Sequence, residues 1–348
     1  MAVLSPSLVE HLALMATRAP SVHNTQPWKL VATADGIEVR ADRSRQLRVL
    51  DPVGRQLLVS CGALVHHLVV ACHALGVDSD VDLLPEPSDP DLVARVRLAV
   101  RLGEPARSEV VEAEAILRRS THRRRFVDGT VEAAALDELR VLVEGQGLSL
   151  GVLRDDDRVV LDALLERAER ELLSDEAYQR ELAAWVFDPD RAGERDDGIP
   201  MAALDNGLGR AEDLPGRRFV PGGSPAHLPV PPEHPAVVVL ASPGDARVDW
   251  VRCGLALSAL LLGAERLGLV AQPLGQVTDL AAERAVLRNE LGLVGVPQLV
   301  LRVGQAVEAL GLLTPRRPVD SVLTWAVDAE EQGAPAPLPA RPVEARLA

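Results

Sequence analysis

The sequence predicts an α+β protein whose two related halves share a helical core. The first observation is an internal repeat: Cys61 opens an apolar helical pattern that ends at Gly76, and Cys253 opens another that ends at Gly268. Each Gly stands 15 residues after its Cys (from 61 to 76 and from 253 to 268). Neither predicted helix has a polar face, so both must be buried, and packing on each other about a pseudo-two-fold axis is the simplest solution. The second observation is that strand patterns flank both helices, alternating around the first and including a continuous apolar run before the second.

The first half is predicted to span residues 1–105. Ser5 is an expected helix cap, because its hydroxyl can accept a free amide and the following Pro6 suits the first turn. Apolar residues three or four apart predict helices, and strict alternation predicts strands. In chain order these patterns predict a helix at 8–18, a strand at 37–41, a helix at 59–75 and a strand at 94–101.

The second half is predicted to span residues 106–330, by the same reasoning. Its predicted helices are 109–119, 131–145, 159–173 and 248–267, and its predicted strands are 148–153, 236–241 and 298–303. Between 188 and 235 periodicity vanishes and Gly, Pro, Asp and Arg dominate. A segment of this length without elements is usually a lid or a disordered insert. The Ala/Pro-rich tail, 331–348, is expected to be flexible.

Composition excludes several classes of protein. The net charge of −14 argues against a nucleic-acid partner. The longest apolar run, 255–264, is far shorter than the ~20 residues of a membrane span, and the N-terminus has no signal-peptide layout. Three cysteines without a CxxC pair indicate buried, reduced thiols in a cytoplasmic protein. Histidines 66, 67 and 73 lack acidic or thiolate partners at ligand spacing, so no metal site is predicted.

The stretch from Pro20 to Trp28, here named the opening loop, follows the first helix. Its two prolines fix φ and push the residues before them out of helical geometry, which predicts a rigid loop. The loop presents four side chains that exchange hydrogen bonds without a fixed charge: Ser21, His23, Asn24 and Gln26. Such groups suit a flat heteroaromatic ligand with carbonyl and imine edges. The alternative is a capped helix-to-strand turn.

Two basic clusters lie in the second half. The first, residues 118–126, holds five arginines and two hydroxyl residues, and the second is 314–318. Clustered guanidinium groups beside hydroxyls suit a dianionic phosphate, which accepts paired hydrogen bonds. The alternative is solvated basic turns. The sequence contains no P-loop, no Ser-His-Asp signature and no GxGxxG after a strand, which argues against direct dinucleotide binding of the Rossmann type.

The opening loop carries all six specified residues of the pattern Pro-Ser-x-x-Asn-x-Gln-Pro-Trp, which resembles the flavin-contacting loop of the nitroreductase superfamily. The resemblance extends from about residue 5 to 325 and is strongest to the Acg-type branch of actinobacterial FMN-binding proteins. It implies FMN as cofactor, NADH or NADPH as reductant, and flavin contacts from the opening loop. The implied loop contacts are Pro20, Ser21, His23, Asn24 and Gln26.

The resemblance also assigns roles in the second half. Arg119 and Ser120 match an Arg-Ser-x-Arg/Lys-x-Phe motif that binds the FMN phosphate and ribityl chain. Two extra residues precede Phe126, so either Arg123 or Arg124 takes the role beside the ring. The basic pair expected to reach the phosphate is Arg316 and Arg317, and the segment with backbone amides near flavin N5 is Pro273, Leu274 and Gly275. Active family members often carry an acidic residue where this chain has Leu274.

The implied fold is nitroreductase-like, with two halves that each contain a mainly antiparallel sheet flanked by helices. The chain then corresponds to the family's dimer fused into one polypeptide, expected to be monomeric. The opening loop occurs only in the first half and the Arg-Ser motif only in the second, so one composite FMN site is expected. The leading function is reduction of a nitro compound or quinone by NAD(P)H, with no catalytic side chain assigned. The alternatives are a flavin-sequestering protein with a lid over FMN and an interaction protein without flavin.

Overall fold

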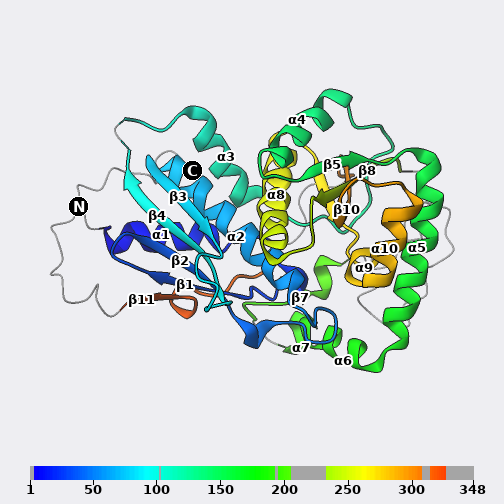
Figure 1. The fold of residues 1–348 in the computed structure, drawn as a ribbon, viewed down its shortest axis with the longest axis horizontal. Helices are drawn as coiled ribbons and strands as arrows, with labels where there is room; N and C mark the ends of the chain where they lie inside the picture. Colours follow the sequence, from blue (N-terminus) through cyan, green and yellow to red (C-terminus); the bar gives the residue numbers. More distant parts are fainter. Residues whose placement is uncertain (1–3, 102, 193–194, 205–232, 308–313, 327–348) are drawn as a thin grey trace.

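Two β-sheets lie on opposite sides of a central pair of long helices, α2 and α8 (Figure 1). This computed structural model describes residues 4–101, 103–192, 195–204, 233–307 and 314–326. The predicted α+β class is confirmed.

The two halves repeat one order of elements: helix, strand, strand, long helix, strand, strand. In the first half these are α1 (Pro6–Ala16), β1 (Trp28–Ala32), β2 (Gly36–Ala41), α2 (Arg55–Ala74), β3 (Val77–Leu83) and β4 (Leu92–Val100). In the second half they are α4 (Ala133–Glu144), β5 (Ser149–Val152), β8 (Ala236–Ser242), α8 (Arg247–Arg266), β9 (Val270–Pro273) and β10 (Val296–Gly304). The remaining elements are α3 (Arg107–Arg118), α5 (Asp155–Ser174), α6 (Glu176–Trp185), β6 (Val186–Phe187), α7 (Pro189–Ala192), β7 (Ile199–Pro200), α9 (Gln276–Asp279), α10 (Ala281–Glu290) and β11 (Leu323–Trp325).

The strand order of the two sheets is equivalent. The first sheet runs β11-β1-β2-β4-β3 and the second runs β5-β8-β10-β9, so β1 corresponds to β5 and β2 to β8. Every pairing in these two sheets is antiparallel except that of β1 with β11, which is parallel. The predicted mainly antiparallel sheets are therefore confirmed. Strand β11 comes from the predicted second half, 106–330, and completes the sheet of the first.

Helices α2 and α8 cross where both carry a glycine. A Cβ added at Gly62 would lie 2.0 Å from the carbonyl oxygen of Val251, and one added at Gly254 would lie 2.0 Å from that of Val59. Each glycine therefore meets the residue three positions before the other glycine, which is the signature of a two-fold relation. The backbones touch at this point, so only glycine fits on either helix.

Two of the histidines of α2, His66 and His67, belong to this helix contact. The Nδ1 atoms of His66 and His67 each lie 2.9 Å from the hydroxyl of Ser258 on α8. Burial lowers the pKa of His66 to about 4 and holds the pKa of His67 well below its usual value, so both rings are neutral in the core. The three cysteines are free and buried.

Helix α2 is, by length and composition alone, apolar enough to cross a membrane, but most of it is buried inside the protein. It begins earlier than predicted, at Arg55 instead of residue 59. The buried carboxylate of Asp51 accepts the backbone N–H of Leu57 at 2.9 Å, and this interaction caps the polar first turn.

The segment 188–235 is only partly without elements. Helix α7 and strand β7, which pairs with β6, lie in its first part. Residues 193–194 and 205–232 of this predicted insert lie outside the described residues, as does the predicted tail, 331–348.

Candidate functional site

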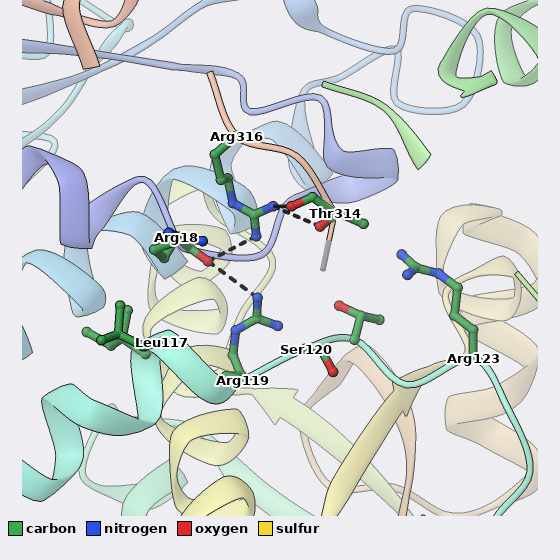
Figure 2. Close-up of a pocket in the computed structure, with 9 residues that line it drawn as sticks. Arg18, Leu117, Arg119, Ser120, Arg123, Thr314 and Arg316 are labelled. Atoms are coloured by element: carbon green, nitrogen blue, oxygen red, sulfur yellow. Dashed lines mark hydrogen bonds between the residues drawn. The ribbon is translucent and has the colours of Figure 1, made fainter. Parts of the chain in front are cut away.

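A pocket opens where the ends of α1 and α3 meet the segment that follows residue 313 (Figure 2). It brings together four of the predicted site residues, Arg119, Ser120, Arg123 and Arg316. The other residues that line it are Arg18, Ile116, Leu117, Thr121 and Thr314. We call it the arginine pocket. Its residues come from both ends of the chain and from its middle.

Arg119 reaches the pocket because helix α3 ends immediately before it. The Arg119 N–H closes the last turn on Ala115, and the backbone then becomes extended, with φ −56° and ψ 127°. The next residues cross onto the second sheet, where the N–H of His122 donates to the carbonyl of Ala271 on β9 at 3.0 Å. Phe126 forms an isolated bridge to Ala306, beyond the end of β10. The predicted phosphate segment is thus held rigidly against the sheet.

The guanidinium of Arg119 is buried and incompletely bonded. The residue is 6% exposed, and its Nη2 donates to the carbonyl of Arg18 at 3.3 Å. Its Nε and Nη1 atoms have no hydrogen-bond partner among the described residues. A buried donor left without a partner costs about 1–3 kcal/mol, and more when it is charged, so a bound anion at this place would stabilise the guanidinium.

The lining of the pocket is strongly basic, with four arginines among the described residues. Among the residues that the structure describes, none that lines the pocket is Asp or Glu. Burial, followed by the charge of Arg123, lowers the pKa of Arg119 to about 10. Burial likewise lowers the pKa of Arg123 to about 10, and burial and the neighbouring arginines lower that of Arg316 to about 9. Burial is the main cause of these shifts, and a phosphate placed among these cations would stabilise their charged forms.

The opening loop is held in strained backbone geometry. His23, Asn24 and Gln26 all have positive φ, at 46°, 55° and 48°. This region is uncommon for residues other than glycine, and it persists only where the surroundings impose it. Two hydroxyls impose it here: Ser21 Oγ accepts the N–H of Gln26 at 2.9 Å, and Ser60 Oγ on α2 accepts the N–H of Val22 at 3.2 Å.

The side-chain amides of Asn24 and Gln26 bridge two distant segments. Asn24 Nδ2 donates to the carbonyls of Gly198 at 2.9 Å and of Pro315 at 3.0 Å. Gln26 Nε2 donates to the carbonyl of Asp196 at 2.8 Å, and its Oε1 accepts the N–H of Arg317 at 2.9 Å. The polar atoms expected to contact a flavin are therefore engaged within the protein. Their role as flavin contacts stays a prediction, and it requires that a flavin replace the protein groups to which these amides now bond.

Of the remaining predicted residues, some lie where a ligand could reach them and others bond within the protein. Arg123 lines the pocket and Arg124 does not, whereas Arg317 turns away and donates to the carbonyls of Gln26 and Ser321. Pro273 has no N–H, and the N–H of Leu274 donates to the carbonyl of Val300 at 2.8 Å. Gly275 is thus the only one of the three predicted residues whose amide can face a ligand.

The sequence did not identify Arg18 or Thr314 as pocket residues. Arg18 is the last basic residue before the opening loop, and that position is its only signal. Thr314 lies in the second basic cluster and gives its carbonyl and hydroxyl to Arg316.

Both ends of the insert are anchored beside the site. At the first end, Asp197 pairs with Arg45, whose Nε donates to the carbonyl of Thr25 in the opening loop. At the other end, Glu233 is buried, pairs with Arg302 and accepts the N–H of Phe126 at 2.7 Å. The first anchor holds the opening loop and the second holds the segment that carries Arg119.

Comparison with known proteins gives consistent matches. The model of the "Nitroreductase family" matches residues 162–305. "Putative NAD(P)H nitroreductase acg" of Mycobacterium tuberculosis is 32% identical over 327 residues, which cover 92% of this chain and 96% of that protein. "Putative NAD(P)H nitroreductase Rv3131" of the same species is 34% identical over 322 residues, 91% of each chain. A solved NADPH:FMN oxidoreductase from Vibrio harveyi, complexed with NAD+, is 14% identical, with a TM-score of 0.37, over 62% of this chain and 76% of that chain.

Proposed function

The chain belongs to the nitroreductase family, and from this we propose that it binds one FMN between the opening loop and the arginine pocket and acts as an NAD(P)H-dependent oxidoreductase. Two mycobacterial relatives that match almost the whole chain carry the name NAD(P)H nitroreductase. The acceptor class that we propose is a nitro compound or a quinone.

The observation that carries the proposal is the buried, half-bonded guanidinium of Arg119 in a pocket without carboxylates. A phosphate monoester fits these donors, because its oxygens accept charge-assisted hydrogen bonds from guanidinium and hydroxyl groups. Ser120 and Thr121 supply the hydroxyls and Arg123 a further charge. FMN, when bound, supplies the hydride chemistry, and the protein supplies binding, orientation and exclusion of water.

The first test is the visible absorbance of the purified protein. We expect a yellow protein with close to one FMN per chain, bleached under anaerobic conditions by NADH or NADPH, and monomeric by light scattering. One FMN is expected because the sequence carries the opening-loop motif only in its first half and the Arg-Ser motif only in its second. A reproducible value near two would refute the single composite site, and a colourless protein that binds no added FMN would refute the cofactor assignment.

A second function, sequestration of flavin with little turnover, is favoured by one observation. Residues 196–198 at the first anchor of the insert occupy the side-chain donors of the opening loop. A segment fixed at this place limits the approach of an acceptor, which must come within about 3–3.5 Å of the reacting atom. The two functions therefore differ in whether NAD(P)H and acceptors reach the flavin.

Replacement of residues 205–232 by a short Gly/Ser linker distinguishes them, because it retains both anchors. If the insert restricts access, the shortened protein will be reduced faster by NADH or NADPH in stopped-flow bleaching and will exchange bound FMN faster. Equal rates of flavin reduction in the intact and shortened proteins would show that the insert does not control access, and the reductase function would stand without it. Reduction of the shortened protein alone would make sequestration the better description.

A further inference from the structure

Arg316 differs from Arg119 in having no donor to spare. A guanidinium carries five N–H groups, and each of the three nitrogens of Arg316 donates to acceptors within the protein. Figure 2 shows its bonds to Thr314 and to the carbonyl of Arg18. Its Nε donates to the carbonyl of Thr17 at 2.9 Å, and its Nη2 donates to the carbonyls of Arg18 at 3.1 Å and Ala19 at 3.4 Å. Its Nη1 has four acceptors: Thr314 Oγ1 at 2.8 Å, Pro315 O at 2.9 Å, Thr314 O at 3.0 Å and Asn24 Oδ1 at 3.2 Å.

These acceptors lie on two pieces of chain that the sequence separates by almost 300 residues. One is the turn from the end of α1 into the opening loop, and the other is the segment that starts at Thr314. Arg316 therefore fixes the position of the opening loop through its hydrogen bonds to the turn before the loop and to Asn24 within it. The carbonyl of Arg18 accepts from both Arg316 and Arg119, so the same turn joins the loop to the arginine pocket.

The bond from Arg316 to Asn24 also sets the direction of the Asn24 amide. A charged donor holds Oδ1, so the nitrogen Nδ2 points to the other side, where it now donates to Gly198 and Pro315. Both N–H groups of Nδ2 are engaged by these carbonyls, so a ligand that replaced one of them would have to present an acceptor, such as a carbonyl or a ring nitrogen.

We infer that Arg316 is a positioning residue, which orients the Asn24 amide and the opening loop, and that the hydrogen bonds to the phosphate come from Arg119, Ser120 and Thr121. The identity of the ligand in this inference rests on the proposed function. The coupling between Arg316 and Asn24 is independent of the proposed function, because it follows from their hydrogen bond.

The test uses Arg316→Lys, Asn24→Ala and the double variant, with Arg118→Lys as the control, because the Arg118 side chain is at the surface and pairs with Glu114 and Glu265. Lysine keeps the charge but concentrates three N–H groups at one point, so it cannot span these acceptors. In the FMN-free protein we expect Arg316→Lys to lower Tm by at least about 2 °C. The double variant should lose less than the sum of the single losses, because both changes break one contact. Arg118→Lys combined with Asn24→Ala should be additive, because the two side chains share no partner.

In the FMN-bound protein we expect Arg316→Lys to shift the flavin spectrum and midpoint potential in the same direction as Asn24→Ala. Its loss of FMN affinity should be smaller than that of Arg119→Ala measured beside it. An affinity loss equal to that of Arg119→Ala with an unchanged spectrum would make Arg316 a phosphate ligand and overturn the inference. Additive Tm losses in the FMN-free cycle would overturn it as well. Failure of the wild-type protein to bind FMN would refute the proposed function and leave the FMN-free cycle as the test of coupling.

Discussion

Replacement of Arg119 by alanine is expected to lower the affinity for FMN roughly ten- to a hundredfold, since a hydrogen-bonded charged group contributes about 1.5–3 kcal/mol. The reason is that Nε and Nη1 of Arg119 are the buried donors of the pocket that have no partner among the described residues. Isothermal titration of the FMN-free protein with FMN would measure the change.

The same variant should behave differently in the FMN-free protein. Burial, followed by the charges of neighbouring arginines, lowers the pKa of Arg119 to about 10, so its charge costs free energy when no phosphate is bound. We therefore expect Arg119→Ala to leave the Tm of the FMN-free protein unchanged or to raise it, while FMN affinity falls.

Arg118→Ala is the matched control, because its side chain is 46% exposed and pairs with Glu114 and Glu265 at the surface. It should bind FMN like the wild-type protein. If Arg119→Ala retained wild-type affinity, or if both variants lost it equally, the pocket would not be the phosphate site.

Gly254→Ala is expected to destabilise the whole chain by about 3 kcal/mol or more, the upper end of the cost of overpacking a core. The added methyl carbon would lie 2.0 Å from the Val59 carbonyl and 2.7 Å from the Ala63 nitrogen, and both belong to the backbone of α2. Backbone inside a helix cannot move aside as a side chain can, so the helices must separate. Thermal and urea unfolding would measure the loss.

Gly263→Ala, on the same helix, is the control for this prediction. Its added methyl carbon would lie 2.4 Å from Leu142 Cδ1, the far end of a flexible side chain. Alanine also favours the helix by about 1 kcal/mol over glycine, so the net change should be small. Equal stability of the two variants would contradict the close crossing, and Gly62→Ala should reproduce the effect of Gly254→Ala from the other helix.

Most of the fold could be predicted because its signals are local. The equal spacing of 61 to 76 and of 253 to 268 predicted two buried helices that pack together, and α2 and α8 do. Two of the strands that were not predicted, β3 and β11, had weak local signals. Strand β3 exposes Asp80 and Asp82 at the edge of its sheet, and β11 is three residues long and joins the other half of the chain.

The sequence predicted most of the residues of the candidate site, but not how they are arranged. Motif resemblance selected Arg119, Ser120 and Arg316, which the structure brings to one pocket. Arg18 was missed, because its place in the pocket depends on where α1 ends relative to α3. The amides of Asn24 and Gln26 were expected to be available to a ligand, but carbonyls of residues 196 and 198 engage them.

The sequence by itself determined which hydrogen-bonding groups and charges the chain carries and which helices must be buried, because those properties belong to side chains and their local spacing. The tertiary structure decided which of these groups remain open to a ligand. Arg119 and Arg316 are the same residue type in similar basic clusters, yet only Arg119 keeps unbonded donors among the described residues. The carbonyls that occupy Arg316 include those of Thr17 and Arg18, nearly 300 residues away, and only the folded chain brings them within 3.1 Å.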